Sequence, residues 1–303
     1  MANAPVMYPL DPATVSGNSI TADTLVNNPT RVNRFIADYL NVNRSRFILD
    51  FVFDNGGGLE GGSVIYEKAG LNDFYATRDV QRVAPGAAFP LVTFSRTAPG
   101  VASPEKWGGQ FEYSYEARDR NDTRLLQRYT TQLANTILRK INIRALQELE
   151  TAITALSGAG VISGHDWSAA IPNGSSPTAP ALTPIADLAA VVETNDLREL
   201  GLVYNTLIMH PTDLTTLRLF YGAALQSVLN DYGFTTLFAT QQVTVGSVYA
   251  LAGRGQVGQY RVEQPLQTVS VEDKLLEKYT VKSSVRPAIF VDNPYGVLKI
   301  TGV

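Results

Sequence analysis

Two glycine-rich stretches have the composition of nucleotide-binding loops. Residues Gly253 to Gly258 match the pattern Gly-x-Gly-x-x-Gly, in which glycines let the backbone approach a pyrophosphate at the start of a helix. The sequence continues as Gln-Tyr-Arg-Val-Glu-Gln-Pro, which favours a strand, and we therefore predict a turn between strands. The run from Gly56 to Gly62 leads into the strand-like Ser-Val-Ile-Tyr-Glu-Lys, without the Lys-Ser or Lys-Thr of a phosphate-binding loop. We expect no cofactor at either stretch.

Side chains that could carry hydrolytic or metal chemistry are few. The chain has two histidines, His165 and His210, and no cysteine, which excludes a three-histidine zinc site, a thiolate site and a cysteine nucleophile. No Gly-x-Ser-x-Gly motif occurs, and no carboxylate pair differs from ordinary surface acids. We predict a protein that is not an enzyme and binds no metal, although distant carboxylates could converge in a fold. A soluble α/β enzyme that uses nucleotides remains the alternative from a different class.

The composition indicates a protein with extensive covered surface. Charged residues make up 17% of the 303 residues and apolar residues 45%, whereas about 25% charged residues is usual. This shortage of charge favours burial of surface by partners; a monomer with a polar, uncharged surface is the alternative. The net charge of −3 gives no general attraction to nucleic acid. We find no secretory signal and no apolar run of membrane-spanning length.

One long helix is the element that must position the rest. The stretch from Asn121 to Leu156 contains no glycine or proline, and we predict a helix with Asn121 as its N-cap and a stop at Ser157-Gly158. Its apolar positions recur mostly in steps of four, so the stripe winds around the helix. These positions are Leu126, Tyr129, Leu133, Ile137, Ile141, Ala145, Leu149 and Ile153.

Basic residues lie opposite this apolar stripe. Arg120, Arg124 and Arg128 oppose its first half, and Lys140 and Arg144 its second half. We interpret the helix as a spine with protein along one side and a basic flank along the other. A solvated cationic face on an ordinary long helix is the alternative.

The region before the spine predicts an excursion that lacks a core. We expect an arm over residues 1–28, a strand over Arg46 to Phe53, and a two-stranded excursion from Ser63 to about Ser95. Five glycines before the excursion form a predicted hinge: Gly56, Gly57, Gly58, Gly61 and Gly62. An isolated hairpin is marginal in water, so its larger side chains are expected to lie on another surface. They are Tyr66, Phe74, Tyr75, Val80 and Val83.

A loop rich in Gly, Ser and Pro over residues 158–184 marks a boundary, and mixed α/β structure follows it. We predict a helix that begins at Pro184, a strand from Leu202 to Met209, and a helix from Pro211 to Tyr221. The last sixteen residues predict two strands around the turn Asn293-Pro294-Tyr295-Gly296.

This order of parts resembles a major capsid protein of tailed bacteriophages, with the Hong Kong ninety-seven type of capsid fold that encapsulins share. Short motifs along nearly the whole chain carry the likeness. They are Val64-Ile65-Tyr66-Glu67, Val83-Ala84-Pro85-Gly86 with Pro90, Lys106-Trp107-Gly108-Gly109, Leu133-Ala134-Asn135-Thr136-Ile137, the run from Asn205 to Pro211, and the run from Arg286 to Val291.

The resemblance implies an α+β capsid fold with four parts. It gives an N-terminal arm over residues 1–45 and an extended loop over 63–95, which lies across a neighbouring subunit. It gives a peripheral domain with the spine helix, over 46–62, 96–156 and 281–303, and an axial α/β domain over 157–280.

The implied function is assembly of hexamers and pentamers into an icosahedral shell around packaged double-stranded DNA. The protein would be made in the cytoplasm of a bacterial host and reside in the virion capsid, without a membrane. Because the first core strand is expected by about Arg46, the resemblance implies a separate scaffolding protein unless residues were removed before Met1. It also implies a portal and a possible decoration protein. Some relatives crosslink a loop lysine, for which Lys68 is available, but no motif identifies its asparagine partner. An encapsulin-like shell around a protein cargo is the second alternative.

Overall fold

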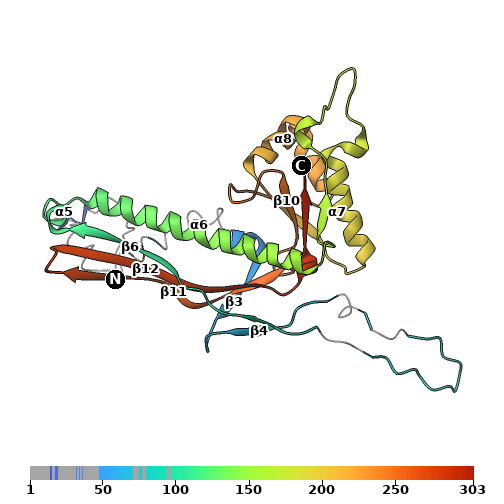
Figure 1. Ribbon diagram of the computed structural model, residues 1–303, viewed down its shortest axis with the longest axis horizontal. Helices are drawn as coiled ribbons and strands as arrows, with labels where there is room; N and C mark the ends of the chain where they lie inside the picture. Colours follow the sequence, from blue (N-terminus) through green and yellow to red (C-terminus); the bar gives the residue numbers. More distant parts are fainter. Residues whose placement is uncertain are drawn as a thin grey trace, which may run out of the picture.

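The computed structural model describes residues 14–15, 18–19, 32, 34, 36, 48–70, 75–76, 80–93 and 97–303. Figure 1 shows an elongated molecule in which a long helix lies over one sheet and meets a second sheet at its far end. A narrow loop projects from the region where the two parts join. Near the N-terminus, β1 (Thr14–Val15) and β2 (Asn18–Ser19) pair as a small antiparallel ribbon.

The predicted spine is helix α6 (Thr123–Ala155), 33 residues long. Its N-cap is Asp122, whose side chain accepts a hydrogen bond from the Leu125 amide at 3.0 Å. The prediction of Asn121 as the cap is wrong by one residue, because Asn121 has φ +54° and separates α6 from the short helix α5 (Tyr115–Asp119). A helix of this length spans about 50 Å.

A four-stranded sheet lies against α6. Its strand order is β3-β11-β12-β6, with β3 (Phe53–Gly58), β11 (Gly258–Asp273), β12 (Lys278–Val291) and β6 (Trp107–Ser114). Only β3 runs parallel to its neighbour; the other pairs are antiparallel. The predicted winding of the stripe fits this arrangement, because Leu126 packs near Tyr113 and Tyr279 at one end, and Ile141 and Leu149 pack in the main core.

The predicted strand from Arg46 to Phe53 is wrong. Ile48–Val52 form a short helix, α3, and the strand begins only at Phe53. The helix buries Ile48, Leu49 and Val52 against α6. Its first amide donates to Oδ1 of the buried Asn142 at 3.1 Å. A five-residue helix is held by this packing, since isolated helices so short are unstable.

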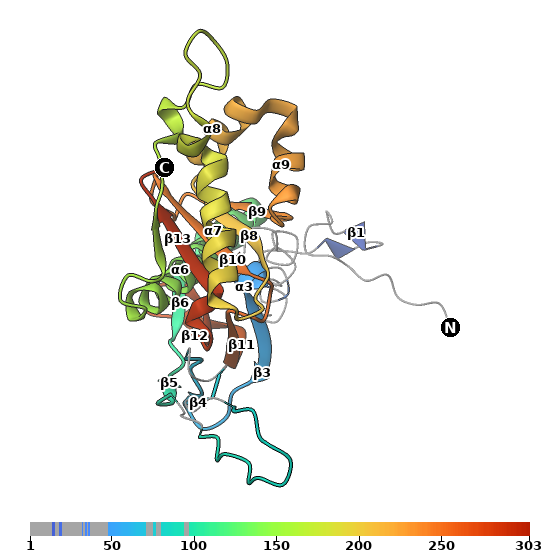
Figure 2. The ribbon, with the colours of Figure 1, turned by 90° about the vertical axis from the view of Figure 1, so that its right-hand side faces the viewer.

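The second sheet has the order β7-β13-β10-β8-β9. Its strands are β7 (Val161–Ser163), β13 (Val297–Thr301), β10 (Ser247–Ala252), β8 (Tyr204–Met209) and β9 (Thr236–Ala239). Helices α7 (Pro184–Arg198), α8 (Pro211–Tyr221) and α9 (Leu225–Asp231) gather around it (Figure 2). Short 3-10 turns complete this part at Trp167–Ala169, Pro180–Leu182 and Gly222–Ala224.

Strands β11 and β13 each lie in a different part of the molecule from the one that the sequence predicts. Strand β11, assigned from the sequence to the axial domain, pairs with β12 and β3 beneath the spine helix. Strand β13, assigned to the peripheral domain, pairs with β10 and β7 in the second sheet. The predicted terminal turn exists as the 3-10 turn Pro294–Gly296, but it carries the chain from one sheet to the other. The predicted boundaries near 280 are therefore wrong for these two strands.

The excursion begins with a two-stranded ribbon, β4 (Val64–Tyr66) and β5 (Gly100–Ala102). The second strand of this ribbon lies at Gly100–Ala102, beyond the expected end of the excursion near Ser95. The described residues between β4 and β5 form a long projecting loop (Figure 1).

Candidate assembly surfaces

The base of the extended loop is fixed to its own subunit. Val64 is buried together with Ala288 and Phe290, and the ring of Tyr66 stacks on Phe290 with centroids 4.5 Å apart. The expectation that Tyr66 has no core of its own to enter is wrong, because the β4–β5 ribbon lies against the end of β12. Burial here raises the pKa of the Tyr66 hydroxyl above its ordinary value of 10.

Beyond its base, the loop presents apolar side chains to solvent. Tyr75 and Val80 are exposed and Val83 is half-buried; Phe74 lies outside the described residues. Two exposed residues that we did not single out are Phe89, 86% exposed, and Leu91, 74% exposed. Exposed apolar patches of this kind are typical of surfaces that bind a partner.

Tyr75 also contacts the second part of its own chain. Its hydroxyl donates a 2.5 Å hydrogen bond to the carbonyl of Glu199, the left-handed residue that ends α7. The loop therefore has a polar contact to the α7 end of the same subunit, in addition to its base.

The five glycines do not form one flexible linker. Gly56, Gly57 and Gly58 belong to β3, which pairs in parallel with β11. Gly61 and Gly62 lie in the following turn with φ of +89° and +77°, values that favour glycine. The hinge prediction is therefore wrong for the first three glycines, because they lie within strand β3. Gly58 is in register with Val262 of β11, and Gly56 and Gly57 lie at an irregularity in that pairing.

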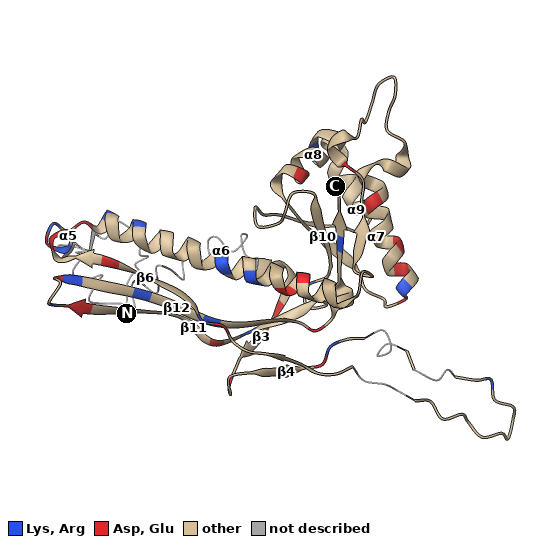
Figure 3. Cartoon of the chain, in the orientation of Figure 1, with Lys and Arg blue, Asp and Glu red and all other residues tan. Residues whose placement is uncertain are grey.

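The three predicted arginines are all exposed. Arg124 and Arg128 are exposed on α6, and Arg120 is exposed just before its cap. None of them is in an ion pair with another residue that the structure describes. Figure 3 shows basic positions spread along α6, with acidic positions confined to the end that meets the second sheet. The helix is thus cationic along most of its exposed length.

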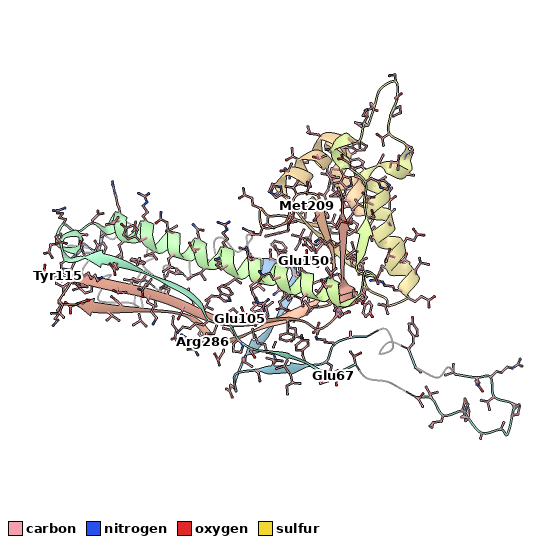
Figure 4. All side chains as sticks on the ribbon, in the orientation of Figure 1. Glu67, Glu105, Tyr115, Glu150, Met209 and Arg286 are labelled. Atoms are coloured by element: carbon pink, nitrogen blue, oxygen red, sulfur yellow. The ribbon has the colours of Figure 1, made fainter. Side chains whose placement is uncertain are left out.

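The acidic end of α6 fastens the helix to the second sheet. Glu150 accepts a 2.5 Å bond from Nζ of Lys299 on β13 and a further hydrogen bond from the hydroxyl of Tyr249 on β10. Burial, together with the nearby Glu150 carboxylate, raises the pKa of Tyr249 well above its ordinary value. Figure 4 labels Glu150 at this joint. The contact couples the spine to two adjacent strands of the sheet, β13 and β10.

The two histidines have structural contacts. His165 and Trp167 both bind the carboxylate of Asp187, at 2.7 Å each, and Asp187 is only 2% exposed. His210 caps α8, where its Nδ1 accepts from the Thr212 amide at 3.1 Å. In the described ranges, no group of three His, Cys, Asp or Glu side chains could hold a metal ion.

The glycine pattern from Gly253 to Gly258 forms the turn between β10 and β11, as predicted. Strand β11 follows it directly, so the helix that would bind a pyrophosphate does not begin there.

A separate cleft of about 970 Å³ lies between α6 and the segment after β9. Amide and hydroxyl side chains and one cation, Arg139, supply its polar lining. Among the described residues that line the cleft there is no carboxylate and no imidazole.

The long β11–β12 hairpin ends in a hydrogen-bonded turn that the sequence patterns above do not predict. Oδ1 of Asp273 accepts from the amides of Leu275 and Leu276, at 3.0 and 3.2 Å. Leu275 is 95% exposed. The Asp-Lys-Leu-Leu-Glu sequence between two polar strands was the signal that could have identified this apolar tip.

No helix within the described residues is long and apolar enough to span a membrane.

A search of curated proteins found no match. Solved structures similar to this chain include the capsid of Myoviridae phage XM1, with 17% identity, a TM-score of 0.60, and coverage of 87% of this chain and 92% of that chain. A Mycobacterium phage Bobi structure has 13% identity, a TM-score of 0.60, and coverage of 82% and 88%. A virus-like particle from Pyrococcus furiosus has 14% identity, a TM-score of 0.58, and coverage of 88% and 95%.

These similarities confirm the predicted α+β capsid fold. The family model described as phage capsid protein matches residues 97–300, which is more than half of the chain. The match includes the spine helix α6 and strands β6, β11 and β12 of the sheet beneath it. The chain belongs to the phage capsid protein family.

Proposed function

We propose that this capsid shell protein assembles through hexamers and pentamers into an icosahedral shell that encloses packaged double-stranded DNA. The role is structural, without catalysis. The observation that carries the proposal is the extended loop, whose described outer part has exposed apolar side chains and no apolar core. Such a loop gains stability by covering a neighbouring subunit, where an interface of ordinary size buries more than about 1,000 Å².

The basic face of α6 supports the part of the proposal that concerns DNA. Arg120, Arg124 and Arg128 are exposed, and we assign the face that carries them to the shell interior. Their attraction to phosphates depends on salt and not on sequence, which suits a genome that must be both stored and released.

Other partners belong to the same proposal. A separate scaffolding protein would organise assembly, a portal would replace one vertex, and a decoration protein would cover the outside. Synthesis in the cytoplasm of a bacterial host precedes residence in the virion capsid.

Expression of the chain with its candidate scaffolding protein, followed by electron microscopy and light scattering, tests the proposal. We expect closed particles of uniform size. If only monomers or small oligomers form at every protein and salt concentration with the scaffold present, the assembly proposal is wrong.

An encapsulin-like shell around a protein cargo is the second candidate, because the virus-like particle from Pyrococcus furiosus is one of the similar structures. The contents of purified native particles separate the two. Double-stranded DNA inside them supports the phage function, whereas a protein cargo without DNA supports the second candidate.

A further inference from the structure

The whole chain contains two Asn-Gly pairs, Asn55-Gly56 and Asn173-Gly174, and their surroundings are opposite. Asn-Gly is the sequence in which an asparagine side chain is most readily attacked by the next backbone nitrogen, because glycine has no Cβ to obstruct the approach. The reaction also requires the backbone after the asparagine to leave the extended conformation of a strand. Local structure therefore decides whether each pair reacts.

Asn173 and Gly174 lie at the tip of an exposed loop. The loop is closed at its base by two bonds between Ile171 and Thr178: the Thr178 amide donates to the Ile171 carbonyl at 3.0 Å, and the Ile171 amide donates to Oγ1 of Thr178 at 2.8 Å. Between these residues the chain has no helix or strand, and both Asn173 and Gly174 are exposed.

Space around the reacting atoms is open. Gly174 has φ +138°, and a Cβ built on it would meet no atom within 4 Å. The side chain of Asn173 makes no hydrogen bond with the part of the chain that the structure describes. Among the described residues, no contact or hydrogen bond opposes the rotation that brings the Gly174 nitrogen to the side-chain carbonyl carbon of Asn173.

Asn55 and Gly56 are held in place. Both lie in β3, where Asn55 is in register with Tyr260 of β11. Oδ1 of Asn55 accepts a 2.9 Å bond from the amide of Gly57, which directs the side chain past the Gly56 nitrogen. A Cβ on Gly56 would lie 2.9 Å from Oε1 of Gln259 and 3.0 Å from the Arg261 side chain, so side chains of β11 cover this glycine. Reaction at Asn55 must wait for β3 to open.

We propose that Asn173 is a site of spontaneous deamidation, whereas Asn55 is protected by the fold. The Gly174 nitrogen forms a bond to Cγ of Asn173 and loses its proton, and the side-chain amide leaves as ammonia. Water then opens the five-membered imide at either carbonyl and yields aspartate or isoaspartate. The balance is asparagine plus water to an acid plus ammonia, so no enzyme, oxidant or reductant is needed.

The product places a charge where the sequence has none. Residues 167–186 contain no Asp, Glu, Lys or Arg, and the loop lies at the outer end of the part built on the second sheet (Figure 3). Each modified chain becomes one unit more negative than its formal −3. If the proposed symmetric shell brings copies of this loop together, the charges repel one another; that consequence rests on the proposed function, but the modification itself does not.

Peptide mapping by mass spectrometry after incubation of the purified full chain at pH 7 and pH 9 tests the site. In the folded protein we expect Asn173 to convert at least about tenfold faster than Asn55. Conversion should be faster at pH 9, because the attacking nitrogen must lose a proton. In strong denaturant, where β3 is lost, the two rates should converge.

A matched variant supports the assignment. Asn173→Gln keeps the amide and the charge but would need a larger ring, and it should abolish the new acidic band in isoelectric focusing. Equal rates at the two sites in folded protein, or no conversion at Asn173, would overturn the proposal whether or not the protein forms shells.

Discussion

The indole Nε1 of Trp167 donates a 2.7 Å hydrogen bond to Oδ2 of Asp187, a carboxylate almost completely buried in the first turn of α7. The same oxygen accepts from the His165 amide at 3.0 Å. One carboxylate thus fastens the loop after β7 to the helix that covers the second sheet.

Asp187→Ala should destabilise this part by about 2 to 4 kcal/mol, because buried donors without an acceptor each cost about 1 to 3 kcal/mol. Urea denaturation followed by tryptophan fluorescence measures the change. Asp166→Ala, in the adjacent exposed cap, is the control and should cost less. Equal effects would show that Asp187 is not the fastening point.

Because of the buried hydroxyl of Tyr204, we expect the folded protein to lose stability at alkaline pH. Burial raises the pKa of its hydroxyl from an ordinary 10 to about 12, and the hydroxyl donates to the Tyr295 carbonyl. Between these pH values the unfolded chain has lost a proton that the folded chain retains. The free energy of unfolding therefore falls as pH rises through this window, by at most about 3 kcal/mol from this group.

Tyr204→Phe removes that titration. The variant should be about 1 kcal/mol less stable at pH 8, because it lacks the hydrogen bond, but its stability should fall less steeply between pH 10 and pH 12 than that of the wild type. Urea midpoints across this range provide the measurement. Parallel curves for the two proteins would contradict the assignment.

Leu133→Pro should prevent assembly by breaking the spine. Leu133 lies in the middle of α6 and packs against the main core. Proline there removes a helix hydrogen bond and costs about 3 kcal/mol or more. Leu133→Ala removes similar packing but keeps the helix, so it should still form particles under electron microscopy. Normal shells from the proline variant would show that a continuous spine is not required.

Replacement of Arg120, Arg124 and Arg128 by glutamine should weaken DNA retention more than shell formation. Each phosphate contact contributes about 0.9 to the slope of log affinity against log salt concentration, so the slope should fall by about 2 to 3 units if all three contact DNA. The control replaces three exposed cations on other elements by glutamine: Arg218, Lys274 and Lys282. If empty shells are lost along with DNA retention, the arginines are subunit contacts and not a DNA surface.

The sequence predicts the parts of this fold that local chemistry determines. Helix α6 follows from a long stretch without glycine or proline, and α8 from His210-Pro211 at its start. Helix α3 could not be predicted, since its apolar run suits a strand until Asn142, far away in sequence, binds its first amide. The exchange of β11 and β13 between sheets is likewise a matter of distant pairing, which no local pattern specifies.

In the candidate surfaces, too, some features follow from local sequence and others depend on residues that are distant in sequence. Exposure of Arg124 and Arg128 follows from helical periodicity, because they lie opposite the apolar stripe. Tyr66 could not be placed in this way, since only the folded chain brings β4 next to Phe290. Gly56 to Gly58 have the composition of a hinge but lie within strand β3, where Gly58 pairs with Val262 of β11.

The last prediction concerns the extended loop beyond its base. Replacement of residues 71–97 by a short Gly/Ser linker leaves the β4–β5 ribbon and the Tyr66–Phe290 stack in place. We expect a folded subunit that cannot form shells, because the removed residues include the exposed Phe89 and Leu91 but none that is buried among the described ones. Circular dichroism and analytical ultracentrifugation test the fold and the size of the variant.

A milder variant tests the apolar contacts of the loop separately from the length of the loop. Phe89→Ser combined with Leu91→Ser keeps the loop length and removes two large apolar side chains, so it should raise the protein concentration needed for assembly without changing the subunit's melting temperature. A subunit that unfolds when the loop is shortened would mean that the loop belongs to its own core. Intact shells from the shortened protein would mean that neighbouring subunits hold together without the loop. The exposed apolar side chains of the loop would then not be needed for assembly.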